Sequence, residues 1–289
     1  MKRHKKVFAF VSIFLIASFL KAMDWPVSNG VLIKNFGWNE GSRTVLGHVF
    51  EGAGEISAVE NGELIFSQSG FNSASRLPVP LGTWVALDHG EGLISIYSRF
   101  ADEEIAVPNI VEKNAALGIA GRSGWSDRQG AYFSIFDRKE RRWVNPSMII
   151  APLPDTRAPT IQSVSLKDAD SRIIDPALVR NISQGRYTIS VVAMDTRLLP
   201  NETPLAPYRI TSIVNGSEVG TLNFETYSAR DGTLMVHRNG LAPVRQVYAN
   251  APGFEVGEVW FTRGQARLEV IAQDINGNSQ TVVYSLTVD

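Results

Sequence analysis

The sequence predicts an all-β protein with two β-domains in series. Its apolar residues fall in short alternating runs of four to eight, and these runs are separated by Gly-containing and Asn-Gly turns, as in antiparallel sheets. No long amphipathic helical pattern is present. A proline-rich segment divides the 289 residues, a length that corresponds to about two domains. With 44% hydrophobic residues, the chain can bury a sizeable core.

The first 22 residues have the order of a secretory signal peptide. Four basic residues at positions 2, 3, 5 and 6 precede an apolar run over residues 7–20, and Ala22 offers a small residue for cleavage. The alternative is a retained membrane anchor, but the run is shorter than the roughly 20 residues of a full span. We therefore expect an exported, periplasmic protein with no stable membrane span after cleavage.

Cysteine content and charge exclude several functions. The chain has no cysteine, which excludes disulfides, thiolate metal sites, a cysteine nucleophile and a bacterial lipoprotein anchor. The formal net charge is −1, and the aromatic residues are not interleaved with basic clusters. A nucleic-acid partner is not expected, because phosphate binding requires a basic face.

Residues 23–150 contain the signals of the first domain. Alternating runs on either side of Gly90-Glu91-Gly92 predict a hairpin over residues 81–100. Asn61-Gly62, between apolar runs at 56–58 and 64–66, predicts a second hairpin. The run AYFSIFD at residues 131–137 predicts a further strand.

The segment 151–159, APLPDTRAP, is predicted to be a stiff linker because its three prolines favour extended backbone. In residues 160–289, two alternating strands end alike, in Ala-x-Asp at Asp195 and at Asp274, and Asn-Gly turns occur at 215–216 and 276–277. Several short strands at this spacing predict a β-sandwich. It loosely resembles the immunoglobulin-like domains attached to exported bacterial proteins.

Four stretches of the first domain, taken in chain order, carry a resemblance to a known family: GEISAVENGEL at 54–64, VALDHGEGLISIYSRF at 85–100, GIAGRSG at 118–124 and VNP at 144–146. Together they resemble the LytM-like, or lysostaphin-type, zinc endopeptidases that cut peptide cross-bridges in bacterial cell wall. The resemblance implies an antiparallel LytM-like sheet and a zinc ion held by His and Asp ligands with one open position.

The metal-binding motifs of that family are replaced here. By resemblance, the H-x-G-x-D motif falls on residues 44–48, with Thr44 at the first ligand and His48 at the aspartate. Arg99 stands for the histidine of Tyr-x-His-Leu, and Ala131 and Phe133 stand for both histidines of H-x-H. We expect zinc, the family cofactor, to be lost and the chain to have no cofactor and no catalytic residue.

Other residues of the predicted groove are candidates for binding: His89, Tyr97 and Tyr132. His48 has two interpretations, either one remaining metal ligand or a partly buried, hydrogen-bonded histidine, and we favour the second. Arg99 could bind the carboxylate of a peptide, or it could be a solvated surface arginine.

The sequence therefore favours an exported, non-catalytic LytM-like protein that binds peptidoglycan or regulates cell-wall hydrolases, with the wall or an envelope protein as its partner. Two alternatives stay open. One is an active zinc endopeptidase that uses His48 and carboxylates, and the other is a purely structural envelope protein.

Overall fold

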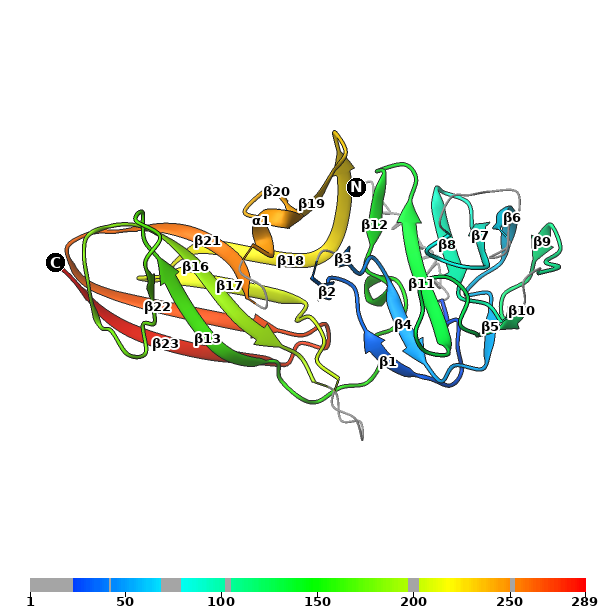
Figure 1. The fold of residues 1–289 in the computed structure, drawn as a ribbon, viewed down its shortest axis with the longest axis horizontal. Helices are drawn as coiled ribbons and strands as arrows, with labels where there is room; N and C mark the ends of the chain where they lie inside the picture. The colour runs from blue at the N-terminus through cyan, green and yellow to red at the C-terminus, as the bar shows by residue number, and fades with distance from the viewer. Residues whose placement is uncertain (1–22, 42, 69–78, 102–104, 197–202, 250–252) are drawn as a thin grey trace, which may run out of the picture.

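The structure is a computed structural model, and it describes residues 23–41, 43–68, 79–101, 105–196, 203–249 and 253–289. It consists almost entirely of β-strands arranged in two halves side by side (Figure 1). The predicted all-β class is confirmed. The predicted signal peptide, residues 1–22, lies outside the described residues.

The first domain is built from short strands and one 3-10 turn. In chain order these are β1 (Val31–Lys34), β2 (Asn39–Glu40), β3 (Arg43–Thr44), β4 (His48–Glu51), β5 (Glu55–Ser57), β6 (Gly62–Gln68), β7 (Trp84–Asp88), β8 (Leu93–Ser98), β9 (Ile110–Val111), β10 (Ala116–Ile119), β11 (Gly130–Asp137), β12 (Arg142–Val144) and η1 (Pro146–Met148).

Strand β11 lies at the centre of this domain. One of its edges pairs with β8, and the sheet continues through β7 and β6 to β9. The other edge pairs with β4 along its first half and with β12 along its second half. Alternate residues of β11 therefore face either the domain core or the opposite surface of the sheet.

The second domain contains longer strands. They are β13 (Thr160–Lys167), β14 (Ile173–Ile174), β15 (Asn181–Ile182), β16 (Gly185–Met194), β17 (Arg209–Val214), β18 (Ser217–Arg230), β19 (Thr233–Arg238), β20 (Leu241–Pro243), α1 (Val244–Val247), β21 (Phe254–Phe261), β22 (Gly264–Gln273) and β23 (Ser279–Val288).

These strands form two sheets around one core. One sheet has the order β14-β13-β16-β21, and the other runs β15-β23-β22-β17-β18. Alternating apolar residues of both sheets are buried between them, for example Leu166, Ile189, Ile210 and Leu268. The predicted sandwich is thus observed, whereas its immunoglobulin-like type stays a prediction.

The two domains share one continuous sheet. The first half of β18 pairs with β17, and its second half pairs with β12 of the first domain. Phe36 of the first domain is fully buried in the core of the second. At Gly37 the backbone has φ of 89°, and a Cβ there would lie 2.7 Å from the Phe224 ring, so the close approach requires glycine.

The proline-rich segment 151–159 contains no strand, and it is hydrogen-bonded to both domains. The Trp25 indole donates to the carbonyl of Ala151 at 3.0 Å. From the second domain, the amides of Asn276 and Asn278 donate to the carbonyls of Leu153 and Asp155, both at 3.2 Å. The segment therefore packs along the contact between the two domains and does not hold them apart as a spacer.

The predicted hairpins have different outcomes. The hairpin around residues 90–92 is confirmed as β7 and β8, and the Asn215-Gly216 turn joins β17 to β18 with both residues at positive φ. The hairpin at Asn61-Gly62 is wrong, because β5 pairs with β10 while β6 pairs with β7 and β9. The chain between β5 and β6 crosses from one sheet to the other.

Within the described ranges, no helix has the length and apolar character that crossing a membrane requires.

Candidate functional site

A groove of about 340 Å³ lies on the face of the first domain opposite its core. Its side chains come from separate parts of the chain: Arg43 and Thr44 from β3, Arg99 from the end of β8, Trp125 from a loop, and Tyr132 from β11. Three of the residues proposed from the sequence, Thr44, Arg99 and Tyr132, are thus brought together.

The backbone of Arg99 determines where its side chain points. Strand β8 ends at Ser98, and Arg99 has φ of 72°, a left-handed conformation that is uncommon outside glycine. In regular alternation Arg99 would share the face of Tyr97, which is buried in the domain core. The left-handed turn instead places Arg99 in the groove. Its carbonyl accepts a hydrogen bond from the backbone N–H of Gly121 at 2.6 Å, which holds this turn.

The groove is cationic and aromatic. The guanidinium of Arg43 lies 4.1 Å from the centre of the Trp125 ring, and that of Arg99 lies 6.0 Å from the Tyr132 ring, both within cation–π range. Within the described part of the chain, no carboxylate forms an ion pair with either arginine. Burial lowers the pKa of the Arg99 guanidinium, and burial raises the pKa of Tyr132 to about 12, so its phenol is neutral at ordinary pH.

The expectation that Ala131 and Phe133 line the groove is wrong. Both are buried in the domain core, where the Phe133 ring packs 5.4 Å from that of Tyr97. Tyr132, between them, faces the groove. Because side chains alternate along a strand, a register error of one residue exchanges the two faces completely.

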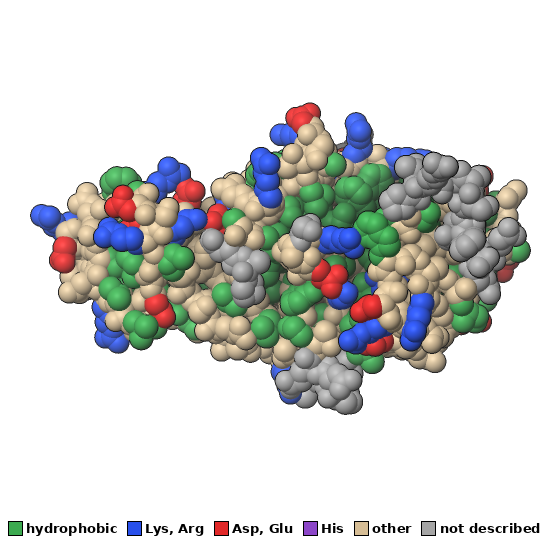
Figure 2. All heavy atoms as spheres, viewed as in Figure 1, with side chains coloured by type: hydrophobic (Ala, Val, Ile, Leu, Met, Phe, Trp, Pro, Cys, Tyr) green, Lys and Arg blue, Asp and Glu red, His purple; other side chains and the backbone are tan. Residues whose placement is uncertain are grey.

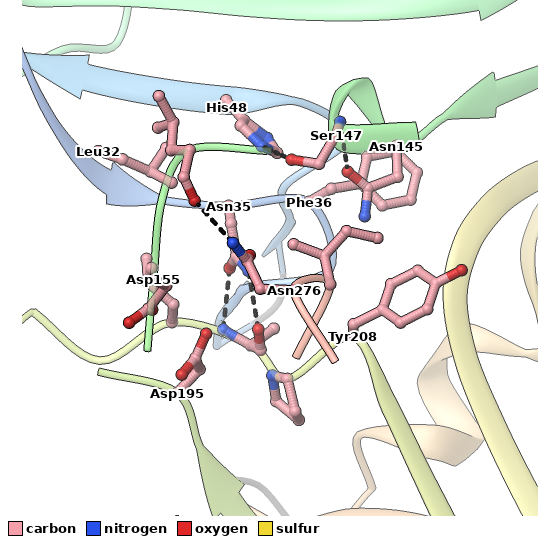
Figure 3. A pocket seen from close by; sticks show the side chains of 15 residues that line it. Leu32, Asn35, Phe36, His48, Asn145, Ser147, Asp155, Asp195, Tyr208 and Asn276 are labelled. Atoms are coloured by element: carbon pink, nitrogen blue, oxygen red, sulfur yellow. Dashed lines mark hydrogen bonds between the residues drawn. The ribbon is translucent and has the colours of Figure 1, made fainter. Parts of the chain in front are cut away.

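The structure also separates His48 from the groove. His48 is 2% exposed, its Nε2 lies 2.9 Å from the Ser147 hydroxyl, and its ring stacks on Trp25 at 5.2 Å. It lines a different hollow, a cavity of about 40 Å³ where the two domains meet (Figure 3). This supports the interpretation of His48 as a buried, hydrogen-bonded histidine.

Hydrogen bonds cross that interdomain cavity. The Asn35 amide donates to the carbonyl of Ala206 at 2.7 Å and accepts from the N–H of the same residue at 2.8 Å (Figure 3). Asp155 of the linker and Asp195 of the second domain also line it. The cavity is therefore a polar junction built by both domains.

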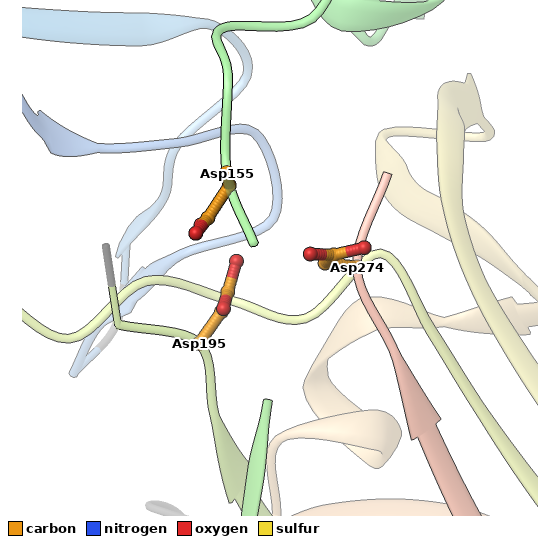
Figure 4. Close-up of side chains that lie close together, drawn as sticks. All are labelled: Asp155, Asp195 and Asp274. Carbon is orange, nitrogen blue, oxygen red and sulfur yellow. The ribbon is translucent and has the colours of Figure 1, made fainter. Parts of the chain in front are cut away.

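Asp155, Asp195 and Asp274 point towards one another, with carboxylate oxygens within 4.8 Å (Figure 4). Two of these aspartates accept hydrogen bonds from residues of their own loops. Asp274 accepts from the backbone N–H of Asn278 at 2.8 Å and from its amide at 2.7 Å, and Asp155 accepts from the N–H of Arg157 at 3.0 Å. The two Ala-x-Asp strand endings thus lie together beside the linker. The sequence pattern alone did not predict that they would be close in space.

The remaining predicted groove residues lie elsewhere. Both ring nitrogens of His89 are hydrogen-bonded, Nδ1 with the carbonyl of Asn61 at 2.7 Å and Nε2 with the hydroxyl of Ser95 at 2.6 Å. The Tyr97 hydroxyl accepts from the N–H of Val59 at 3.0 Å, and burial raises the pKa of this phenol. Tyr97 is thus part of the domain core, and His89 lines a separate hollow with Asn61 and Asp88.

The groove does not fit zinc, the cofactor implied by the family resemblance. Zinc in proteins is bound by imidazole, thiolate or carboxylate ligands. Thr44, Arg99 and Tyr132 provide none of these, and the guanidinium repels a cation. The carboxylate that lines the groove, Glu40, lies 2.6 Å from the ammonium of Lys34.

A second hollow adjoins the groove at Thr44, which lines both. Its far wall belongs to the second domain, with Leu234 from the β18–β19 hairpin and Val244 and Arg245 from α1. A space-filling view shows apolar side chains gathered where the two domains meet, with basic side chains among them (Figure 2). Groove and hollow form one surface that neither domain supplies alone.

Sequence reasoning missed Arg43 and Trp125. Arg43 is adjacent to the predicted position Thr44, and both line the groove. Trp125 lies in a loop, and no sequence signal placed it against Arg43.

Comparison with solved structures finds similar proteins among peptidases. The catalytic domain of the prophage-encoded M23 protein EnpA from Enterococcus faecalis is 19% identical over 42% of this chain and 91% of its own, with a TM-score of 0.35. A putative peptidase M23 from Pseudomonas aeruginosa is 22% identical over 46% of this chain and 52% of its own, with a TM-score of 0.34. The antimicrobial peptidase lysostaphin from Staphylococcus simulans is 13% identical over 70% of this chain and 80% of its own, with a TM-score of 0.32.

These similarities agree with the predicted resemblance to lysostaphin-type peptidases. At such identities and TM-scores they carry no argument about activity, substrate or partner. One protein-family model matches residues 158–289. No curated protein matches the chain.

Proposed function

We propose that this chain is an exported, non-catalytic LytM-like protein that binds peptidoglycan through the groove of its first domain. One observation carries the proposal. The groove positions are occupied by Arg43, Thr44, Arg99, Trp125 and Tyr132, which can contact a peptide or a sugar but cannot hold a zinc ion.

The arrangement supports binding without hydrolysis. Peptide-bond hydrolysis by this class of enzyme requires a metal that polarises the carbonyl and activates water. His48, the remaining candidate ligand, is hydrogen-bonded to Ser147 in a separate cavity. The groove instead has donors and aromatic faces, which are the usual means of binding a polar ligand.

The test is co-sedimentation of the purified full chain with purified sacculi, with and without a metal chelator, together with analysis of released muropeptides. We expect retention on sacculi in both conditions and no released muropeptides. Chelator-sensitive release would identify an active zinc endopeptidase. Absence of retention would favour a purely structural role in the envelope.

Variants locate the binding surface. Trp125→Ala removes the aromatic side chain that Arg43 covers, and we expect it to weaken retention about tenfold, as removal of a stacking contact worth 1–2 kcal/mol would. Trp260→Ala is the matched control, because Trp260 is 62% exposed on the second domain, away from the groove. Equal retention of both variants would place binding elsewhere.

A further inference from the structure

We propose that Arg99, assisted by Arg43, is a receptor for the free carboxylate at the end of a peptidoglycan stem peptide. The inference rests on the proposed function and specifies which chemical group the groove recognises. In this account a fixed guanidinium is the positive centre of the groove, so the ligand is held by its negative charge instead of being cleaved.

The backbone conformation of Arg99 is unusual for a residue other than glycine. A left-handed φ of 72° is unfavourable for a residue with a Cβ, and such conformations persist where the surrounding structure enforces them, often at functional sites. Glycine would adopt the same turn without that penalty. The turn directs the side chain away from the core of Tyr97 and Phe133 and into the groove.

Arg99 forms no ion pair with a described carboxylate. Its guanidinium is partly buried; Glu40 is paired with Lys34, and both Glu40 and Asp127 act on Arg99 through space without forming an ion pair. Arg43 is likewise unpaired among the described residues, and three basic side chains and one carboxylate line the groove. A desolvated cation of this kind favours an anionic ligand.

The shape of the groove and the geometry of its guanidiniums fit the end of a peptide. A guanidinium presents parallel N–H donors that match both oxygens of a carboxylate, which makes arginine well suited to this group. The volume of about 340 Å³ is that of a small-ligand pocket, and the adjoining hollow beyond Thr44 has room for the rest of a peptide. These features together fit the carboxyl end of a short peptide.

The test is isothermal titration of the full chain with acetyl-lysyl-D-alanyl-D-alanine and with the same peptide amidated at its carboxyl end. We expect the free acid to bind about 10- to 100-fold more tightly than the amide, as a charge-assisted hydrogen-bond pair would give. Arg99→Gln should remove this difference. Arg122→Gln, an exposed arginine outside the groove, is the matched control and should preserve it.

Arg99→Gly separates a structural role from a binding role. This variant keeps the left-handed turn and removes the guanidinium, so we expect it to unfold at the same temperature as the wild type or higher, and to lose the preference for the acid.

Two results would overturn the inference: equal affinity for acid and amide, or an unchanged preference in both Arg99 variants. If either occurs while sacculi still retain the protein, only the carboxylate assignment fails. If sacculi do not retain the wild-type chain, the proposed function itself is wrong, whatever the peptide titrations show.

Discussion

The two hollows of the molecule differ in how their polar groups are satisfied. In the interdomain cavity, Asn35 exchanges two hydrogen bonds with Ala206, and His48 is hydrogen-bonded to Ser147 and stacked on Trp25. In the groove, Arg43 and Arg99 contact aromatic rings but no described carboxylate. Asn35 and His48 bond to groups of the chain in the cavity, whereas the two arginines of the groove leave their charge for a ligand.

This difference separates structural from binding residues without reference to the family. A histidine is the obvious candidate for chemistry, yet His48, which stands at the aspartate position of the predicted motif, lies in the interdomain cavity. Arg99, which the sequence could equally place on a solvated surface, lies in the groove. Mutations in the cavity should therefore change stability, and mutations in the groove should change binding.

The largest effect is expected at the contact between the domains. Phe224→Ala removes a fully buried ring that packs against Tyr248 and Phe254, close to Gly37 of the first domain. The free energy of unfolding should fall by about 3–5 kcal/mol, as for other buried aromatic residues. Denaturant unfolding measures this, and a loss below about 1 kcal/mol would show that the domain contact contributes little.

A smaller effect is expected at His48. His48→Ala removes the hydrogen bond to Ser147 and the stacking on Trp25, so the free energy of unfolding should fall by about 1–3 kcal/mol. Retention on sacculi at a temperature where the variant is folded should not change. The control is His237→Ala on the exposed face of β19. If His48→Ala, but not His237→Ala, lost retention on sacculi, the interdomain cavity would also take part in binding, which would contradict its purely structural role.

The smallest effect is expected from pH. Arginine side chains in general keep their charge between about pH 5 and 9, and Tyr132, with its pKa raised to about 12, stays neutral there. Affinity for the free-acid peptide should be constant there and should fall below about pH 4, because the carboxylate of the ligand, with a pKa of about 3.5, becomes protonated. A transition near pH 6.5, where histidine ordinarily titrates, would contradict an arginine-based site.

Local signals predicted much of the fold. The Gly90-Glu91-Gly92 hairpin and the Asn215-Gly216 turn formed as expected, because residues at positive φ determine such turns by themselves. Asn61-Gly62 carried the same signal and did not form a hairpin, because the strand before it pairs with β10. The pairing of β12 with β18 joins residues far apart in the sequence and has no local signal.

The site was harder to predict than the fold, for two physical reasons. A shift of one residue on β11 reverses which side chains face the groove, so Tyr132 was assigned correctly while Ala131 and Phe133 were not. Alternation also fails at Arg99, where the left-handed turn directs the side chain away from the face of Tyr97. The location of His48 depends on packing by Trp25 and Ser147, which no spacing in the sequence indicates.

The most direct test of the account is the metal content of the purified full chain after incubation with zinc and removal of unbound ions. Because the groove presents guanidiniums and hydroxyls instead of imidazole or thiolate ligands, we predict far less than one zinc per chain and unchanged peptide affinity in the presence of a chelator. One tightly bound zinc per chain, with chelator-sensitive release of muropeptides from sacculi, would contradict the account.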